Sequence, residues 1–179
     1  LHGISKSPAI FDIEKLTHFN SEYIRKLPDE RFFPYADRFL TANLPAALNK
    51  GKMLSLLKTR IQTFAELNEK SAFFLALPDY DKELFLNKKN KIQDYETVAT
   101  VLTAAKDTLI AQNDFSNDAL FSVLGGLTEK LGMKTGSIMW CLRIAVSGLA
   151  ATPGGATEIM EVIGKDETLA RIDAALARL

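Results

Sequence analysis

Residues 98–114, VATVLTAAKDTLIAQND, show most directly how this chain folds. Apolar side chains return at steps of three and four residues, at Val98, Val101, Leu102, Ala105 and Leu109. This spacing places them along one face of an α-helix, which the polar segment after Ala111 ends. The same steps recur through most of the chain, whereas the alternation of a half-buried strand and long internal repeats are both missing. We therefore predict an all-α protein.

Capping residues and glycines mark where the helices on the C-terminal side begin and end. The first expected helix is capped by Ser116, carries apolar residues from Leu120 to Leu131 and ends at Gly132; the second holds Ile138 to Val146 and ends at Gly148. The third runs from the turn Thr152-Pro153-Gly154-Gly155 through Ile163 and closes at Gly164, and the last is capped by Asp166 and has its apolar positions at Leu169, Ile172 and Leu176.

On the N-terminal side, two apolar stripes predict two longer helices. The first opens near Asp12, stops before Pro28 and presents one face made of Leu16, Phe19, Tyr23 and Leu27. The second is one continuous helix containing Arg60, with a stripe made of Leu54, Leu57, Ile61, Phe64 and Leu67. Between them, prolines predict two short helices, at residues 31–41 and 45–49.

Residues 78–93, PDYDKELFLNKKNKIQ, lose the helical period and carry Pro78 and a run of charge. This composition is typical of a linker, in which Lys88-Lys89-Asn90-Lys91 is expected to be a solvated run. We therefore predict two small helical bundles, the first ending near residue 77.

The composition indicates a soluble, folded chain. It has 179 residues, 47% hydrophobic, and 22 basic residues balance 22 acidic ones, although residues 1–60 carry ten basic against six acidic residues. Its single cysteine, Cys141, cannot form an internal disulfide and is expected to pack in a helix in a reducing compartment. There is no apolar run of about 20 residues and no signal peptide. A start at Leu1 instead of methionine predicts a piece of a longer protein.

The residues that self-contained catalysis requires are missing. There is no nucleophile motif or phosphate-binding glycine loop, and His2 and His18 have no acidic cluster around them, so no metal site is expected. Ser5-Lys6-Ser7 is most simply a solvated turn before Pro8.

Three features suit RNA recognition, and each has a simpler interpretation. Arg60, with Lys58 beside it, can reach a base edge or be a solvated arginine. Trp140 can stack on an unpaired base next to Arg143, or it can belong to the core. The turn at residues 152–155 permits close backbone approach, or it serves only as a helix start. The residues alone leave these alternatives open.

Several spaced motifs resemble bacterial glutamyl-tRNA synthetases, which are class I aminoacyl-tRNA synthetases. The opening Ile4-Ser5-Lys6-Ser7-Pro8-Ala9-Ile10-Phe11-Asp12, with Lys15-Leu16, Asn20 and Tyr23-Ile24-Arg25, is similar to the segment after their catalytic core. Gly132-Met133-Lys134, Leu142-Arg143, Ser147-Gly148 and Thr152-Pro153-Gly154-Gly155 are similar to their C-terminal anticodon-binding region. The resemblance spans essentially the whole chain, in order.

The resemblance implies a role in translation: recognition of the tRNA(Glu) anticodon as part of a cytoplasmic, monomeric ligase that joins glutamate to tRNA(Glu). ATP and Mg²⁺ would serve the complete enzyme, whereas this chain would need no cofactor, bind no DNA or membrane, and be inactive alone. It also implies segments at residues 1–28 (end of the stem-contact region), 29–77 (anticodon-binding subdomain 1), 78–93 (linker) and 94–179 (subdomain 2).

By the same resemblance, Arg60 reads the third anticodon base and prefers tRNA(Glu), which has C there, over tRNA(Gln), which has G. The positions that read the other two bases fall on Arg143, Thr152, Pro153 and Gly155, and Trp140 and Lys58 are further candidates for RNA contact. Many relatives have proline where this chain has Cys141. The alternative is a helical adaptor or protein-interaction module without RNA specificity; a complete enzyme with an unrecognised active site is a third reading.

Overall fold

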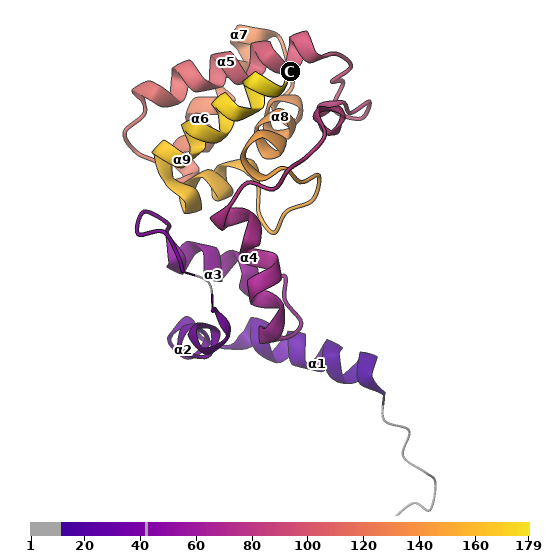
Figure 1. Ribbon diagram of the computed structural model, residues 1–179, viewed down its shortest axis with the longest axis vertical. Coiled ribbons are helices and arrows are strands. Elements are labelled where there is room, and N and C mark those ends of the chain that lie inside the picture. The colour runs from indigo at the N-terminus through magenta and orange to yellow at the C-terminus, as the bar shows by residue number, and fades with distance from the viewer. Residues whose placement is uncertain (1–11, 42) are drawn as a thin grey trace, which may run out of the picture.

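A computed structural model describes residues 12–41 and 43–179 (Figure 1). The elements, in order, are α1 Ile13–Lys26, α2 Asp29–Phe39, α3 Lys50–Lys58, the 3₁₀ turn η1 Phe64–Glu66, α4 Leu67–Leu75, the 3₁₀ turn η2 Lys82–Phe85, α5 Tyr95–Ala111, α6 Asn117–Gly125, α7 Leu127–Leu131, α8 Thr135–Ser147 and α9 Ala156–Arg178. In these residues the only β-type pairing is an isolated bridge between Asn87 and Ile92. The all-α prediction is confirmed. The predicted turn at residues 5–7 and His2 lie outside the described part.

The helices form an upper group, α5 to α9, and a lower group, α1 to α4, with α3 and α4 beneath α9 (Figure 1). In the upper group the five predicted apolar positions of α5 are fully buried. Gly132 and Gly148 end α7 and α8 with φ of 63° and 66°, as their positions predicted. The predicted helix through Leu131 is instead two: α6 ends at Gly125 and α7 begins at Leu127, with Gly126 between them.

The second predicted N-terminal helix is wrong as a continuous element. Helix α3 ends at Lys58, residues 59–63 form a turn, and η1 and α4 follow. The cause is a new helix start at Thr63, where the Glu66 carboxylate accepts hydrogen bonds from the backbone N–H groups of Gln62 (3.0 Å) and Thr63 (2.8 Å). Arg60 therefore lies in a turn and not in a helix.

The short helix predicted at residues 45–49 is also wrong. These residues form a turn, and Asn49 caps α3 by accepting a hydrogen bond from the Lys52 N–H at 3.0 Å. Helix α2 at Asp29–Phe39 matches the other short helix that the prolines predicted.

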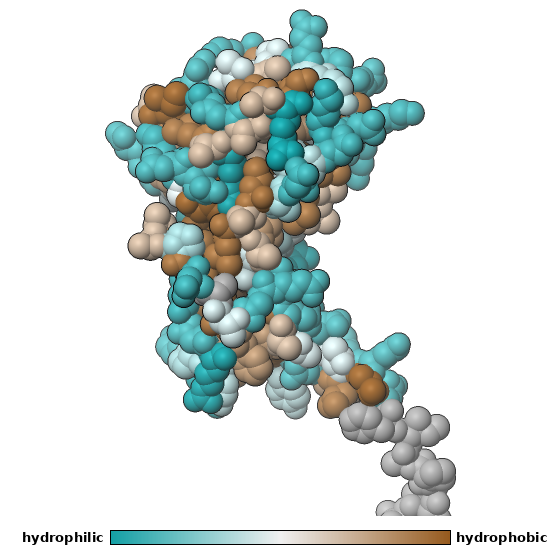
Figure 2. Space-filling model, in the orientation of Figure 1, coloured by the Kyte–Doolittle hydropathy of each residue, from teal (hydrophilic) through white to brown (hydrophobic). Residues whose placement is uncertain are grey.

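Helix α1 starts at Asp12 as predicted, but it buries a different face. Asp12 accepts a hydrogen bond from the Lys15 N–H at 3.0 Å. Three of the four predicted positions face outward, since Leu16 is 52%, Phe19 49% and Tyr23 74% exposed, whereas Leu27 is half-buried against the core. Ser21 and Ile24 are buried instead. Figure 2 shows the apolar patch at the outer end of α1. Periodicity locates an apolar face but does not say what covers it.

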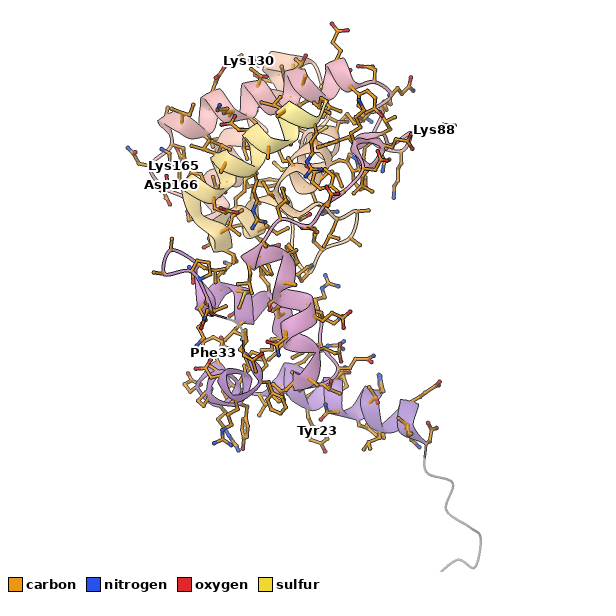
Figure 3. The ribbon with its side chains drawn as sticks, in the orientation of Figure 1. Tyr23, Phe33, Lys88, Lys130, Lys165 and Asp166 are labelled. Carbon is orange, nitrogen blue, oxygen red and sulfur yellow. The ribbon has the colours of Figure 1, made fainter. Side chains whose placement is uncertain are left out.

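The segment predicted as a linker is held to α8. Phe85 and Ile92 are buried. The Trp140 indole N–H donates to the Phe85 carbonyl at 2.9 Å, and the Ser137 hydroxyl donates to the Asn90 carbonyl at 2.6 Å. Lys88, Lys89 and Lys91 remain exposed, and Lys88 points away from the body in Figure 3. Residues 82–93 thus pack with the upper group, while the division into subdomains stays a prediction.

One buried cation joins the two groups of helices. Arg171 in α9 is 2% exposed. Its guanidinium donates to the carbonyls of Phe73 (2.8 Å) and Phe74 (3.0 Å) near the end of α4, and of Val146 (2.7 Å) near the end of α8. Its Nε donates to Glu167 at 2.6 Å. The last carbonyls of a helix have no partner within the helix, so Arg171 satisfies groups that burial would otherwise penalise.

Replacement of Arg171 by Met should destabilise the chain by about 3–5 kcal/mol, because three carbonyls lose a charged donor that methionine does not replace. The free energy of unfolding in urea measures this effect. Arg31→Met is the matched control: Arg31 is exposed and makes no ion pair in the described residues, so a loss of about 0.5 kcal/mol or less is expected. An equally small loss for Arg171→Met would contradict the cross-link.

The cysteine should be inert while the protein is folded. Cys141 is fully buried, and burial raises the pKa of its thiol to about 12. Because the thiolate is the reactive form, a disulfide reagent at pH 8 should label the thiol only after unfolding in guanidinium. Rapid labelling of the folded chain would show that α8 opens readily.

Candidate nucleic-acid interface

Arg60 sits in the turn that follows α3, and this turn is fixed from both sides. Its backbone N–H donates to the Leu57 carbonyl at 2.8 Å, which continues the end of α3. On the other side, Glu66 binds the N–H groups of Gln62 and Thr63. Burial raises the pKa of Glu66, but the hydrogen bonds from Thr63 and Gln62 lower it more, so it lies below the ordinary value of 4.5. A charged Glu66 thus holds the turn that presents Arg60.

The second predicted element, residues 152–155, is a compact turn at the start of α9. The Thr152 hydroxyl donates to the Gly154 carbonyl at 2.7 Å, and the Gly155 N–H donates to Glu158 at 2.7 Å. A Cβ on Gly154 would lie 3.0 Å from the Glu158 Oε2 and 3.3 Å from the Leu56 Cδ1. The turn therefore rests closely on α3, and the backbone N–H of Gly155 is already occupied.

The structure brings Arg60 and this turn together across 93 residues of sequence. The Arg60 Nε donates to the Pro153 carbonyl at 3.2 Å. Both residues border a pocket of about 450 Å³. Figure 1 shows the loop between α8 and α9 beside the upper end of α4, where this pocket lies. Three of the predicted residues, Arg60, Thr152 and Pro153, thus share one site.

Residues that the sequence did not single out complete the pocket. Phe73, Pro78 and Leu149 supply apolar walls. Glu69 and Lys70 supply charges of opposite sign, and the Lys70 ammonium also pairs with Glu66 at 3.5 Å. Pro78 packs closely on the loop because Gly148 has no side chain: a Cβ there would lie 2.9 Å from the Pro78 Cγ. No local sequence signal groups these residues, because they come from three separate segments.

Arg143 does not line this pocket, but its backbone is linked to a pocket residue through hydrogen bonds of the Ser147 hydroxyl. Its carbonyl accepts a hydrogen bond from the buried Ser147 hydroxyl at 2.7 Å. The same hydroxyl accepts from the N–H of Leu149, a wall of the pocket, at 3.1 Å. The Arg143 Nε is buried without a hydrogen-bond partner in the residues that the structure describes. Arg143 therefore belongs to the same end of α8 as the pocket.

The two further candidates make contacts within the protein. Trp140 binds the Phe85 carbonyl and packs against the core, which favours the packing interpretation. The Lys58 ammonium forms an ion pair with Asp29 at 2.8 Å, donates to the Leu27 carbonyl and lies 5.5 Å from the centroid of the Phe32 ring. Lys58 thus ties α3 to the junction of α1 and α2.

Apolar walls and convergent donors suit a flat, partly polar ligand such as an unpaired base. In residues 12–41 and 43–179, no group of three or more His, Cys, Asp or Glu side chains is arranged to hold a metal ion. None of the helices in that part of the chain is long and apolar enough to span a membrane.

A family model described as an anticodon binding domain matches residues 4–176. The chain is 38% identical to the glutamate–tRNA ligase of Clostridium novyi (strain NT), over 99% of this chain and 37% of that protein. It is also 38% identical to the glutamate–tRNA ligase of Lachnoclostridium phytofermentans, over 98% of this chain and 36% of that protein. The chain thus spans a little over a third of the length of these curated relatives.

Solved structures show the same fold. A crystal structure of a glutamate tRNA ligase from Elizabethkingia meningosepticum, in complex with its amino acid, matches 98% of this chain and 34% of its own, with a TM-score of 0.83 and 26% identity. A glutamate-tRNA synthetase structure from Elizabethkingia anophelis matches 97% of this chain and 33% of its own, with a TM-score of 0.79 and 22% identity.

Replacement of Glu66 by Gln should destabilise the chain by about 1 kcal/mol at pH 7, because a neutral acceptor makes weaker hydrogen bonds. A lowered pKa stabilises the fold above the ordinary value of 4.5, and this contribution disappears as the pH falls and the carboxyl group is protonated. The difference between the two proteins should therefore shrink as the pH falls below 4.5 and Glu66 becomes protonated. Urea denaturation at a series of pH values measures it; a difference that is constant with pH would show that the charge of Glu66 does not hold the turn.

Proposed function

The chain belongs to the anticodon-binding domain family, and from this premise we propose that it reads the anticodon of tRNA(Glu) as part of a glutamate–tRNA ligase. One observation carries the proposal: Arg60 and the turn at residues 152–155, which lie far apart in sequence, border a single pocket. A ligand in that pocket touches both elements at once.

Arg60 has the chemistry to select the third anticodon base. A guanidinium only donates hydrogen bonds, and the Watson–Crick edge of cytosine offers two adjacent acceptors, O2 and N3. The same edge of guanine carries N–H donors opposite the guanidinium. Since the Arg60 Nε is bound to the Pro153 carbonyl, its two terminal amino groups are left for the base. We propose that the pocket accepts C and disfavours G, which separates tRNA(Glu) from tRNA(Gln).

The rest of the pocket suits the remainder of a nucleotide. Phe73, Pro78 and Leu149 offer apolar surface to the faces of a base. We assign the other two anticodon bases to Arg143 and to Thr152, Pro153 and Gly155, on the strength of their resemblance to the family pattern. With its N–H bound to Glu158, Gly155 would contribute through the shape of the turn.

The activity of the complete ligase is a proposal for the longer protein. There, glutamate would be joined to tRNA(Glu) with ATP and Mg²⁺, in the cytoplasm and by a monomer. Because this chain spans only a little over a third of its curated relatives, we assign ATP and Mg²⁺ to the remainder of a complete ligase. The chain alone would bind tRNA without aminoacylating it.

Binding of a fluorescent tRNA(Glu) anticodon stem-loop, at several salt concentrations, tests the proposal. The chain should bind the loop with C at the third position more tightly than the loop with G. Arg60→Ala should remove this preference at a cost of about 1–3 kcal/mol, the usual range for a bidentate base contact. Arg31→Ala, which removes an exposed charge elsewhere, should keep the preference.

Other outcomes point elsewhere. Equal binding of both loops, with the same dependence on salt, would indicate an RNA module that does not select this base. Absence of binding to any loop would contradict the proposal for the isolated chain and favour a helical adaptor that binds protein.

A further inference from the structure

Arg60 combines one hydrogen bond to the protein with terminal donor groups that stay available, a combination that a lysine in its place would not offer. Its Nε donates to the Pro153 carbonyl, while its terminal amino groups make no hydrogen bond within the described residues. The side chain is exposed and borders the pocket, so these amino groups are accessible to a ligand. A guanidinium is planar and rigid, so the position of one edge fixes the direction of the other.

Within the described residues, the Pro153 carbonyl accepts no hydrogen bond other than the one from Arg60. Farther along the turn, Glu158 holds the Gly155 N–H, and the Thr152 hydroxyl holds the Gly154 carbonyl. Proline has no backbone N–H to donate. Arg60 therefore connects the turn after α3 to the turn before α9.

The base of this connection is firm. The backbone of Arg60 is fixed by the Leu57 carbonyl on one side and by the Glu66 carboxylate, through Gln62 and Thr63, on the other. A movement of the Arg60 guanidinium toward a base would consequently displace the Pro153 carbonyl to which it is bonded, and a movement of the turn would displace the guanidinium.

We propose that Arg60 is a positioning residue for the 152–155 turn as well as a reader of the third base, so that recognition of that base is energetically coupled to recognition of its neighbours. This inference rests on the proposed function for the RNA part and on the Arg60–Pro153 contact for the protein part. The coupling is positive: the matching third base holds the guanidinium, which holds the turn in place for the other bases.

The contact is measurable without RNA. The carbonyl of Pro153 and the N–H of Gly154 belong to the same peptide group, so the amide nitrogen resonance of Gly154 reports on the hydrogen bond to that carbonyl. In ¹⁵N-labelled protein, Arg60→Ala and Arg60→Lys should both shift the Gly154 resonance, while Arg31→Ala should leave it in place. An unchanged Gly154 resonance in Arg60→Ala would overturn the proposal, whatever the RNA binding.

The coupling is measured with four stem-loops: the third base is C or G, and the second base is native or substituted. For the wild-type chain, the two base changes should be non-additive: because each single change already removes the coupling, the combined loss of affinity should be at least threefold smaller than the product of the single losses. For Arg60→Lys the changes should become additive, although the charge and the dependence on salt are retained. Additive losses in the wild-type chain would refute the coupling.

The two parts of the test separate the proposals. A wild-type chain that binds all four loops equally refutes anticodon reading and the coupling with it, while the Gly154 resonance still decides whether Arg60 holds the turn. A clear preference for C combined with additive losses leaves anticodon reading intact and overturns only the coupling.

Discussion

The candidate site depends on one buried guanidinium, that of Arg171. A charge in the interior is tolerated only when its donors are satisfied, and Arg171 meets this condition by binding carbonyls at the ends of two helices and the Glu167 carboxylate. The end of α4 is thereby fixed against the end of α8. Phe73, one of the bound residues, is a wall of the pocket, and the chain after Val146 continues to Leu149, another wall. The pocket therefore lies where Arg171 makes the two groups of helices meet.

Helix α9 contacts α3 with its first part and carries Arg171 in its second part, and a kink separates the two parts. Gly164 has φ of 80°, a conformation that side chains disfavour, and it separates the helix into two parts. The first part holds α3, through the Val162 carbonyl to the Asn49 N–H (2.8 Å) and the ion pair of Glu161 with Lys52 (2.9 Å). The second part carries Arg171. Lys165 and Asp166 mark the bend in Figure 3. A straight helix would not present these groups in the same directions.

Sequence predicted the parts of the fold that depend on local chemistry. The stripe of α5 and the ends at Gly132 and Gly148 follow from spacing and from backbone freedom, which are properties of neighbouring residues. The break after α3 also had a local signal: Thr63 and Glu66 form the Thr-x-x-Glu pattern of a capping box, which the continuous apolar stripe concealed. The outward face of α1 had no such signal, because burial depends on what lies opposite.

The pocket was beyond local reasoning for the same cause, since Arg60 and Pro153 meet only in the folded chain. Lys58 and Arg60 illustrate the point, because both are basic and lie two residues apart. The ammonium of Lys58 is engaged within the protein by Asp29, the Leu27 carbonyl and the Phe32 ring. Arg60 donates one hydrogen bond to the protein, from its Nε, and its terminal amino groups remain available to a ligand. For the proposed reading of the anticodon, attraction to phosphate carries no sequence information, so selection would have to come from donors that are fixed in direction. A guanidinium held at its Nε meets that requirement, which an ammonium at the same position does not.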